Sequence, residues 1–438
     1  MRKQKRAAIR EMGYDEYEHY LKTRRRRRWI KFAAVVGALV FIFGTFAVVN
    51  VFGNRANTKM AESIAAVTKQ DALEPVWDAE ASHWVFTTDR EFKVLQLTDI
   101  HIGGGFMSFK KDYMALNAVA LMITAERPDL VIVTGDIAYP VPFQSGSFNN
   151  LAATKVFASL MQSLGVYWTV ALGNHDAEAY SYYTRDKIAE YYASGLDYCL
   201  FTRGPADIAG EGNQVIEVRN SQGLITRSFF VFDSHSYTDG DILGVQWKYD
   251  NIKQSQVDWY SAEVGKMNAK NAAVLGTLND ADLTAKFSTV KSLAFFHIPL
   301  VEMLDAWQEY KNNGSQDTAD VKFIYGVAGE SKKTVFCGIG EDELFETILE
   351  LESTQGLFFG HDHLNNFSLE YKGIRMTYSP SIDYLAYFGI QKLGSQRGCT
   401  VITSSPNGSW SCKAENYYQD KYWSPDYEKE KVEMQWAN

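Results

Sequence analysis

Residues 91–101 read EFKVLQLTDIH, an apolar run that ends in a carboxylate and an imidazole. The apolar part has the composition of a strand, and the polar residues end it. The same order returns in DLVIVTGD (129–136) and in YWTVALGNHD (167–176). Apolar residues at helical spacing lie between these runs, at 112–126 and 149–164. Strands that alternate with helices predict an α/β fold, in which helices pack on the faces of a sheet.

Later segments of the chain extend this pattern. Apolar runs at 228–232, 292–296 and 356–359 predict further strands, and helical periodicity predicts helices at 254–267 and 341–353. We therefore expect central β-sheets flanked by helices, an α/β arrangement with the character of an α+β sandwich.

Polar residues of the kinds that bind metals follow five of the apolar runs. They are Asp99 and His101, Asp136, the segment Asn174, His175 and Asp176, then His297, and last His361 and His363. Side chains at the carboxyl ends of adjacent strands converge, which is where open α/β sheets place their sites. Five of the eight histidines lie directly after these runs, and chance does not explain such a concentration.

The types of side chain in this set indicate divalent metal ions. Imidazole and carboxylate suit Mn, Fe and Zn, and no cysteine is in the set, which disfavours a closed structural zinc site. A carboxylate can bridge two ions through its two oxygens. Two ions about 3.5–4 Å apart clamp a phosphate group and lower the pKa of a water between them. The set therefore predicts a site for two divalent ions that is able to bind a phosphate group and activate a water.

In chain order the motifs are D-x-H, G-D, G-N-H-D, a lone H and G-H-x-H, from Asp99 to His363. This series resembles the calcineurin-like metallophosphoesterases. The segments FFHIPLVEM (295–303) and FFGHDHLNNF (358–367) are similar to the purple-acid-phosphatase-like branch of plants and fungi. The resemblance implies a metallophosphoesterase fold with two metal ions.

The resemblance also implies a role for each position. Asp99, His101 and His363 would hold one metal, Asn174, His297 and His361 the other, and Asp136 would bridge them. A hydroxide held by the metals would attack phosphorus, and His175 would steady or protonate the leaving oxygen. Asp176 would orient His175.

The sequence departs from purple acid phosphatases at two positions. Those enzymes have D-x-G in the first motif, and they bind iron with the tyrosine of G-D-x-x-Y. Here His101 occupies the competing ligand position, so we interpret Tyr139 as a packing or substrate-facing residue and expect no stable purple iron site. Many relatives also carry an acidic residue three places after the bridging Asp136, as a partner of the catalytic histidine. Tyr139 stands there instead, so that pair is not available.

The resemblance favours phosphate monoesters as substrates. A phosphodiesterase of the same fold is the alternative, because residues 176–296 and the tail would decide whether the pocket admits a second substituent. A catalytically inactive surface binding protein would show a broken ligand set, and no ligand is missing here.

Residues 32–52 (FAAVVGALVFIFGTFAVVNVF) contain no charged side chain, and about 20 apolar residues cross a bilayer as a helix. Five arginines precede this segment at 24–28, and only Arg55 and Lys59 follow closely. The positive-inside rule then places the N-terminus in the cytoplasm. We expect a single-pass protein of the cell membrane with its catalytic domain on the extracytoplasmic side. A cleaved secretory signal is the alternative, although the basic N-terminal region and the apolar run are both longer than those of a typical signal.

We divide the chain into a basic cytoplasmic tail (1–31), a membrane helix (32–52), a stalk (53–90), the phosphoesterase domain (91–397) and a C-terminal hairpin and tail (398–438). The basic tail holds twelve Lys and Arg against four Asp and Glu, so the net charge of −9 leaves about −17 on the remainder. Such an acidic body disfavours nucleic acid as a partner, because that binding depends on Lys and Arg contacts to phosphates. Nothing in the sequence indicates the oligomeric state.

Four cysteines in an oxidising space permit disulfides, in any of three pairings. The segment CTVITSSPNGSWSC, between the last two of them, predicts a hairpin with the Asn-Gly pair at 407–408 in its turn. That register places Cys412 opposite Thr403 and Cys399 opposite Asn416. It therefore does not favour a direct bridge between these two cysteines.

The three remaining histidines lie outside the motifs. We interpret His235, in the segment FDSHS, as a surface-loop residue, with contact to substrate as the alternative. We expect His19 and His83 to be solvated.

Overall fold

The computed structural model describes residues 9–238, 248–340, 342–387, 390 and 397–415. The chain divides into two units, Met1–Phe52 and Gly53–Asn438. Residues 1–8 of the basic tail and 416–438 of the C-terminal tail lie outside the described residues.

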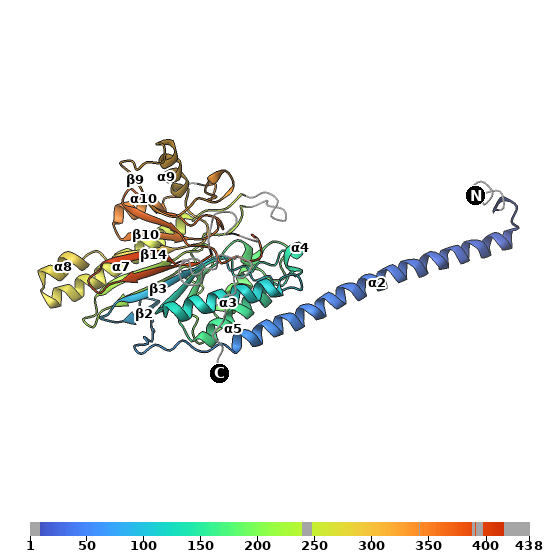
Figure 1. Ribbon diagram of the computed structural model, residues 1–438, viewed down its shortest axis with the longest axis horizontal. Helices are drawn as coiled ribbons and strands as arrows, with labels where there is room; N and C mark the ends of the chain where they lie inside the picture. Colours follow the sequence, from blue (N-terminus) through green and yellow to red (C-terminus); the bar gives the residue numbers. More distant parts are fainter. Residues whose placement is uncertain (1–8, 239–247, 341, 388–389, 391–396, 416–438) are drawn as a thin grey trace, which may run out of the picture. The chain divides into compact units, whose positions relative to one another are not determined.

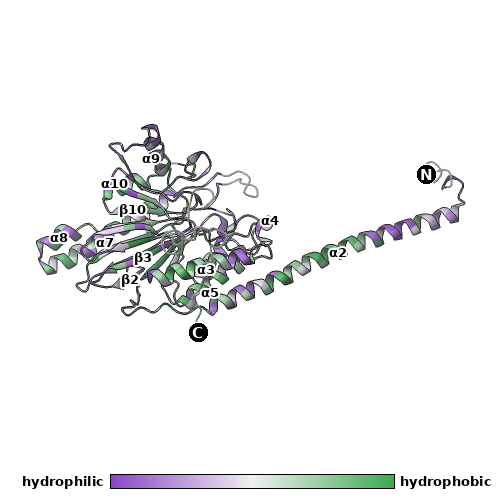
Figure 2. Cartoon of the chain, viewed as in Figure 1, coloured by the Kyte–Doolittle hydropathy of each residue, from purple (hydrophilic) through white to green (hydrophobic). Residues whose placement is uncertain are grey.

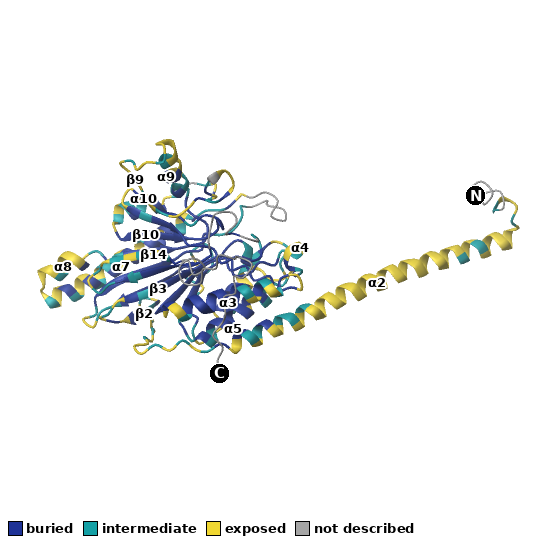
Figure 3. Cartoon of the chain, viewed as in Figure 1, coloured by how far each residue is buried: buried dark blue, intermediate teal, exposed yellow. Residues whose placement is uncertain are grey.

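Helix α2 (Tyr14–Glu62) contains the whole apolar segment that the sequence predicts at 32–52. Its most apolar window of 18 residues has a mean hydropathy of 2.6, and none of that window is buried (Figures 2 and 3). By length and composition this helix is able to cross a membrane, and a signal sequence near the N-terminus passes the same test.

Five strands form the first sheet of the unit Gly53–Asn438, in the order β14-β13-β3-β4-β5 (Figure 1). Strands β3, β4 and β5 are parallel, and β13 joins β3 in the antiparallel sense. The strands are β3 (Phe92–Leu97), β4 (Leu130–Thr134), β5 (Trp168–Ala171), β13 (Cys399–Ser404) and β14 (Trp410–Glu415). The helices in this half are α3 (Phe109–Glu126), α4 (Pro142–Ser145), α5 (Asn150–Leu164) and α6 (Arg185–Tyr192), with a 3-10 turn at His175–Ala177.

Nine strands form the second sheet, in the order β1-β2-β6-β7-β8-β10-β12-β11-β9, and its central strands β7, β8, β10 and β12 are parallel. The strands are β1 (Val76–Asp78), β2 (His83–Thr87), β6 (Gln214–Arg219), β7 (Ile225–Val231), β8 (Ser292–Phe295), β9 (Val321–Tyr325), β10 (Thr354–Phe359), β11 (Ser368–Tyr371) and β12 (Ile374–Tyr378). The helices are α7 (Gln254–Leu278), α8 (Ala281–Phe287), α9 (Val301–Asn312) and α10 (Leu344–Leu351), with a 3-10 turn at Ser331–Lys333.

Successive side chains of a strand point to opposite faces of its sheet, and this divides the apolar core into layers. Val94 of β3 packs with Phe229 and Phe295 of the second sheet, in a cluster built without helix residues. Leu95, its neighbour, points the other way and packs with α3 and α5. A third cluster joins the second sheet to α7, α9 and α10. The layers therefore follow one another as helices, sheet, sheet and helices. Because the central strands are buried on both faces, their sequences are continuous apolar runs.

The main elements predicted from the sequence are confirmed, from the strand at 91–98 to the helix at 341–353. Two segments placed outside the predicted domain belong to its sheets. Strands β1 and β2 lie in the segment interpreted as a stalk, and β13 and β14 lie in the segment interpreted as a tail hairpin. β13 pairs with β3 over Thr400–Ser404, so the hairpin completes the first sheet.

The predicted register of this hairpin is wrong by one residue. Cys412 lies opposite Ile402, and Cys399 lies opposite Glu415. The turn has three residues instead of two, because Gly408 adopts a φ of 85° and its N–H donates to Ser405 O. No disulfide joins any of the four cysteines among the described residues, and the two in this hairpin are not opposite each other.

The prediction that His83 is solvated is also wrong. Its side chain is buried in β2, between Glu217 of β6 and Glu263 of α7. His235 is half-buried, and its Nε2 lies 2.9 Å from Oε1 of Gln256. His19 is exposed on α2, as expected.

Candidate metal centre

Both sheets send their candidate ligands to one edge. Asp99 and His101 follow β3, Asp136 follows β4, Asn174 and His175 follow β5, His297 follows β8, and His361 and His363 follow β10. These five strands run parallel within their sheets, so their carboxyl ends share an edge. The predicted convergence of these side chains is what the fold produces.

Four of the residues form a buried cluster with the geometry of a cation site. Donor atoms of Asp99, His101, Asp136 and His363 all lie within 4.8 Å of one another. His363 Nε2 is 3.5 Å from Asp99 Oδ1, and His101 Nε2 is 3.4 Å from Asp136 Oδ2. We call Asp99, His101 and His363 the first ligand group, and Asp136 completes the cluster.

Three more residues form a second ligand group beside the first. Asn174 Oδ1 lies 3.0 Å from His297 Nε2 and 3.0 Å from His361 Nδ1. His297 Nδ1 donates to Thr134 O at 2.7 Å, so Nε2 is the ring nitrogen that remains available to a metal ion. Asp136 Oδ2 is 3.2 Å from His297 Nε2, so the Asp136 carboxylate lies between the two groups. In that position its two oxygens would be able to bridge two ions.

The backbone at these ligands is strained. Asp99, His101, Asp136 and His361 have φ values of 49°, 54°, 53° and 75°. Such conformations are uncommon for residues with a side chain and cost about 1 kcal/mol or more each. Their concentration at one site indicates that the surrounding fold holds the ligands in place against this cost.

The glycine of each motif makes room for a ligand. A Cβ on Gly173 would lie 2.1 Å from Asp136 Oδ1, and a Cβ on Gly135 would lie 2.5 Å from His297 Nδ1. A Cβ on Gly360 would lie 2.8 Å from Asp99 Oδ2. The motifs therefore need glycine because backbone and ligand approach more closely than a methyl group permits.

Asp383 supports the first group from behind, and the sequence did not predict it. Its Oδ1 is 3.2 Å from His101 Nδ1, and its Oδ2 is 3.5 Å from His363 Nδ1. Backbone amides of Leu385 and Ala386 donate to the same carboxylate. A carboxylate behind a ligating imidazole fixes the ring and makes its metal-facing nitrogen more basic. The available signal was the alternating run of β12, which leads into the loop that carries Asp383.

Burial and neighbouring charges shift the pKa values of two residues of this cluster, and a bound cation would stabilise its buried carboxylates. Burial raises the pKa of Asp99 to about 6, and the charge of Asp136 adds to the rise. Burial opposes protonation of His101, but the carboxylates of Asp383 and Asp136 outweigh it and raise its pKa to about 10. Asp99 Oδ1 is buried without a hydrogen bond among the described residues. Hard oxygen and imidazole donors with an unpartnered carboxylate oxygen fit divalent ions.

Comparison with known families agrees with this geometry. The calcineurin-like phosphoesterase model matches residues 92–365, more than half of the chain. The chain belongs to the calcineurin-like phosphoesterase family. The expected similarity to purple-acid-phosphatase-like proteins is confirmed by the relatives described next.

One similar protein is "Probable inactive purple acid phosphatase 28" of Arabidopsis thaliana, 27% identical over 329 residues, which cover 69% of this chain and 73% of that protein. Another is "Phosphatase DCR2" of Saccharomyces cerevisiae, 28% identical over 329 residues, which cover 71% of this chain and 50% of that one. A dimetal phosphatase from Danio rerio is 12% identical and covers 75% of this chain and 97% of its own, with a TM-score of 0.45.

In this phosphoesterase, His175 lies beside His101 and Asp136, and its side chain pairs with Glu178. Its side chain is 22% exposed, and its Nδ1 is 2.5 Å from Glu178 Oε1. Its backbone N–H donates to Asp136 Oδ1 at 2.8 Å. Tyr237 donates to the same Glu178 oxygen and accepts from Asn174, so it links the acid pair to the second ligand group.

Asp176, which the sequence suggested as the partner of His175, has a different place. Its carboxylate accepts backbone N–H groups of Gly173, Asp136 and Ala138 at 2.8–3.0 Å. It thereby ties the loop after β5 to the loop after β4. Glu178, three residues after His175, holds the ring instead, and a one-turn spacing was the signal for it.

Tyr139 packs against two histidines of the phosphoesterase site. Its ring stacks on His101 with 4.5 Å between centroids and meets the edge of His175 at 4.8 Å. Burial and the charge of Asp383 raise the pKa of Tyr139, which opposes formation of the phenolate that iron would need.

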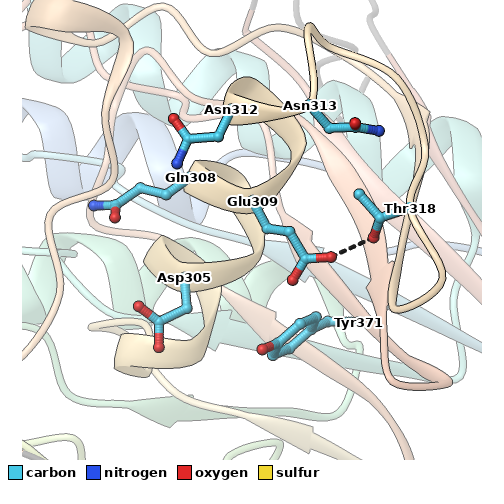
Figure 4. A pocket seen from close by; sticks show the side chains of 7 residues that line it. All are labelled: Asp305, Gln308, Glu309, Asn312, Asn313, Thr318 and Tyr371. Atoms are coloured by element: carbon cyan, nitrogen blue, oxygen red, sulfur yellow. Dashed lines mark hydrogen bonds between the residues drawn. The ribbon is translucent and has the colours of Figure 1, made fainter.

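A separate surface hollow lies beside α9 (Figure 4). Its lining includes Asp305, Glu309, Thr318 and Tyr371, and Thr318 donates a hydrogen bond to Glu309. It shares no residue with the two ligand groups. Its lining contains no histidine or cysteine, so it adds nothing to the chemistry of the site.

Proposed function

We propose that this metallophosphoesterase is a membrane-anchored enzyme that hydrolyses phosphate monoesters with two divalent ions. The observation that carries the proposal is the position of the Asp136 carboxylate between the two ligand groups. An inactive member of the fold would be expected to have lost a ligand. All seven residues are present here, which favours an active enzyme although relatives in Arabidopsis thaliana are named inactive.

Asp99, His101 and His363 would hold one ion, Asn174, His297 and His361 the other, with Asp136 shared. The ions, when bound, would neutralise the phosphate oxygens and lower the pKa of the attacking water. Asp383 would hold the rings of His101 and His363 in their orientation.

His175 would supply the proton that the leaving alkoxide needs. Its Nδ1 is bound to Glu178, so its Nε2 is the nitrogen available to the ester oxygen. The carboxylate of Glu178 holds the ring in its orientation through Nδ1, and Tyr237 donates a hydrogen bond to the same carboxylate oxygen. Proton transfer by a positioned imidazole contributes about 10²–10⁴ in rate.

The apolar span of α2 supports an anchor in the cell membrane, with the phosphoesterase domain on the extracytoplasmic side. Fractionation of cells that express the full chain tests this. An intact chain recovered in the membrane fraction, with the domain digested by protease added outside, supports the anchor. A shortened, soluble chain would show that the helix is a cleaved signal.

The activity is tested on the full chain with para-nitrophenyl phosphate and its diester, supplied with Mn, Fe or Zn. We expect bound metal and faster hydrolysis of the monoester, with both lost in Asp99→Asn. Absence of metal from the wild type contradicts the proposal. Faster hydrolysis of the diester keeps the enzyme class and changes the substrate.

A further inference from the structure

An exposed apolar rim borders the edge that carries the ligand groups. We define the rim as Phe106, Met107, Phe143, Phe148 and Tyr182, which are 37%, 50%, 88%, 40% and 68% exposed. They lie on the loops that follow β3, β4 and β5, the same loops that begin with the candidate ligands. Among the described residues after Gly53, Phe143 is the most exposed large apolar side chain. Single exposed apolar residues are ordinary, but a group on one surface marks an interaction site.

Contacts between the loops make the rim one surface. The N–H of Met107 donates to Ser145 O at 3.1 Å, next to Phe143 on α4. The N–H of Tyr182 donates to Phe148 O at 2.9 Å, and the two rings stack with centroids 6.0 Å apart. A Cβ on Gly146 would lie 2.6 Å from the ring of Phe106, which shows how closely the first two loops meet.

The first residues of the phosphoesterase unit are fixed to the same loop. Asn54 Nδ2 donates to Gly104 O at 2.8 Å, two residues before Phe106. A Cβ on Gly53 would lie 2.0 Å from the ring of Phe109. Phe52, the last residue of the apolar span, is the next residue in the chain, and one peptide unit spans about 3.8 Å. Covalent geometry therefore leaves no linker between the end of a membrane span and the loop that carries the rim.

Basic side chains predominate around this attachment point, where Glu62 is the exposed acid of the helix end. Arg55, Lys59 and Lys110 are exposed on the segments that meet there. Aromatic side chains beside Lys and Arg are the combination found at the headgroup level of membranes, where the rings sit at the interface and cations attract anionic lipids. This composition favours a lipid surface over a protein partner.

We propose that the rim inserts into the headgroup region of the bilayer that anchors the chain, and that the site hydrolyses phosphate monoesters of membrane lipids. This rests on the proposed function, and it names the substrate class of that site. Water adds to phosphorus, the bond from phosphorus to the lipid oxygen breaks, and the lipid oxygen takes a proton. The products are a lipid alcohol and inorganic phosphate.

The test uses the full chain reconstituted in phosphatidylcholine vesicles that contain phosphatidic acid, with para-nitrophenyl phosphate as the water-soluble ester. The rim variant carries Met107→Ser, Phe143→Ser and Tyr182→Ser. The control variant carries Ile324→Ser and Ile339→Ser, which are 42% and 61% exposed and lie outside the rim. We expect the rim variant to lose about tenfold or more on phosphatidic acid, because three apolar contacts with the bilayer are lost. Both variants should hydrolyse the soluble ester at the wild-type rate.

The outcomes separate this inference from the proposed function. Wild-type hydrolysis of the soluble ester without hydrolysis of phosphatidic acid overturns the inference and leaves the function standing. Hydrolysis of neither ester overturns both. Equal rates for wild type and rim variant on phosphatidic acid also overturn the inference.

A second measurement decides the case in which the rim variant loses both activities through misfolding. A nitroxide on Phe143→Cys, in a full chain that also carries Cys337→Ser and Cys412→Ser to remove the partly exposed native thiols, should be shielded from a water-soluble relaxant by the vesicles. A nitroxide on Ile339→Cys should stay accessible. Equal access at both positions overturns the inference.

Discussion

The Nδ1 atom of His101 lies 3.2 Å from Oδ1 of Asp383, on the side of the ring away from the ligand groups. The other Asp383 oxygen faces His363 Nδ1 in the same way. One buried carboxylate thus orients two imidazoles of the first ligand group. The orientation that metal binding needs is therefore built into the loop after β12.

Asp383→Asn is expected to weaken the affinity of the first ligand group for its ion by about 10–100-fold, the usual cost of losing a carboxylate behind a ligating histidine. Asparagine keeps an acceptor for the amides of Leu385 and Ala386, so the loop should fold. Metal titration with calorimetry measures the change. Asp129→Asn is the control, since it weakens a half-buried ion pair with Arg90 that is outside the site and should lower stability alone. Unchanged metal affinity in Asp383→Asn would contradict this role.

Glu178→Gln is expected to slow hydrolysis according to the leaving group. Phenyl phosphate should lose about 10²-fold in kcat, because its leaving oxygen needs the proton that His175 supplies. Para-nitrophenyl phosphate should lose much less, since its leaving group is stable as an anion. Glu190→Gln, in an exposed pair with Lys187, is the matched control. An equal loss on both esters would indicate a general distortion of the site.

Residues that carry the chemistry could be predicted because each strand ends where its motif begins. Apolar runs fixed the strands, and parallel order brought Asp99, Asp136 and His361 to one edge. Asp383 and Glu178 could not be predicted in this way. Neither follows its strand directly, and their roles depend on where loops turn after leaving the sheet.

The edges of the sheets were also beyond reach of the sequence pattern. Strand β2 is short, and the sequence pattern does not show that its His83 is buried. The reason for that burial is the pairing of His83 with Glu217 and Glu263, which are distant in the sequence. The prediction of the hairpin register was wrong for a local reason, the φ of 85° at Gly408. One extra residue in that turn moves every pair in β13 and β14 by one place.

Gly173→Ala is expected to remove at least one of the two ions. The new Cβ would lie 2.1 Å from Asp136 Oδ1, so the bridging carboxylate must move. Overpacking of this kind costs about 1–3 kcal/mol as well. Metal content by elemental analysis measures the loss. Gly265→Ala in α7 is the control, because its Cβ meets nothing within 4 Å and alanine favours the helix by about 1 kcal/mol. Full metal content in Gly173→Ala would contradict the close approach.

His83, on strand β2, joins strand β6 and helix α7 through buried charges. Its Nδ1 is 2.6 Å from Glu217 Oε1 and its Nε2 is 3.2 Å from Glu263 Oε2. Burial alone would lower the pKa of His83, but the hydrogen bonds and charges of the two carboxylates outweigh it and raise the pKa. Burial likewise opposes ionisation of Glu217, yet the hydrogen bond from His83 and the charge of Arg219 hold its pKa below the usual value.

The pH dependence of stability follows from these directions. The stabilisation from protonated His83 is complete below its unfolded pKa of about 6.5 and is lost as pH rises through the raised folded pKa. The carboxylates contribute above their unfolded pKa of about 4.3 and lose this as pH falls through the lowered folded pKa. His83→Gln should therefore destabilise most between about pH 4.5 and 6.5, by about 1–3 kcal/mol, because two buried carboxylates lose the charged hydrogen-bond partner between them and keep only Arg219 and Lys266. Thermal unfolding at pH 6 and pH 9 measures this, with the exposed His19→Gln as control. A difference from wild type that is larger at pH 9 than at pH 6 would show that His83 is not held protonated by this pair.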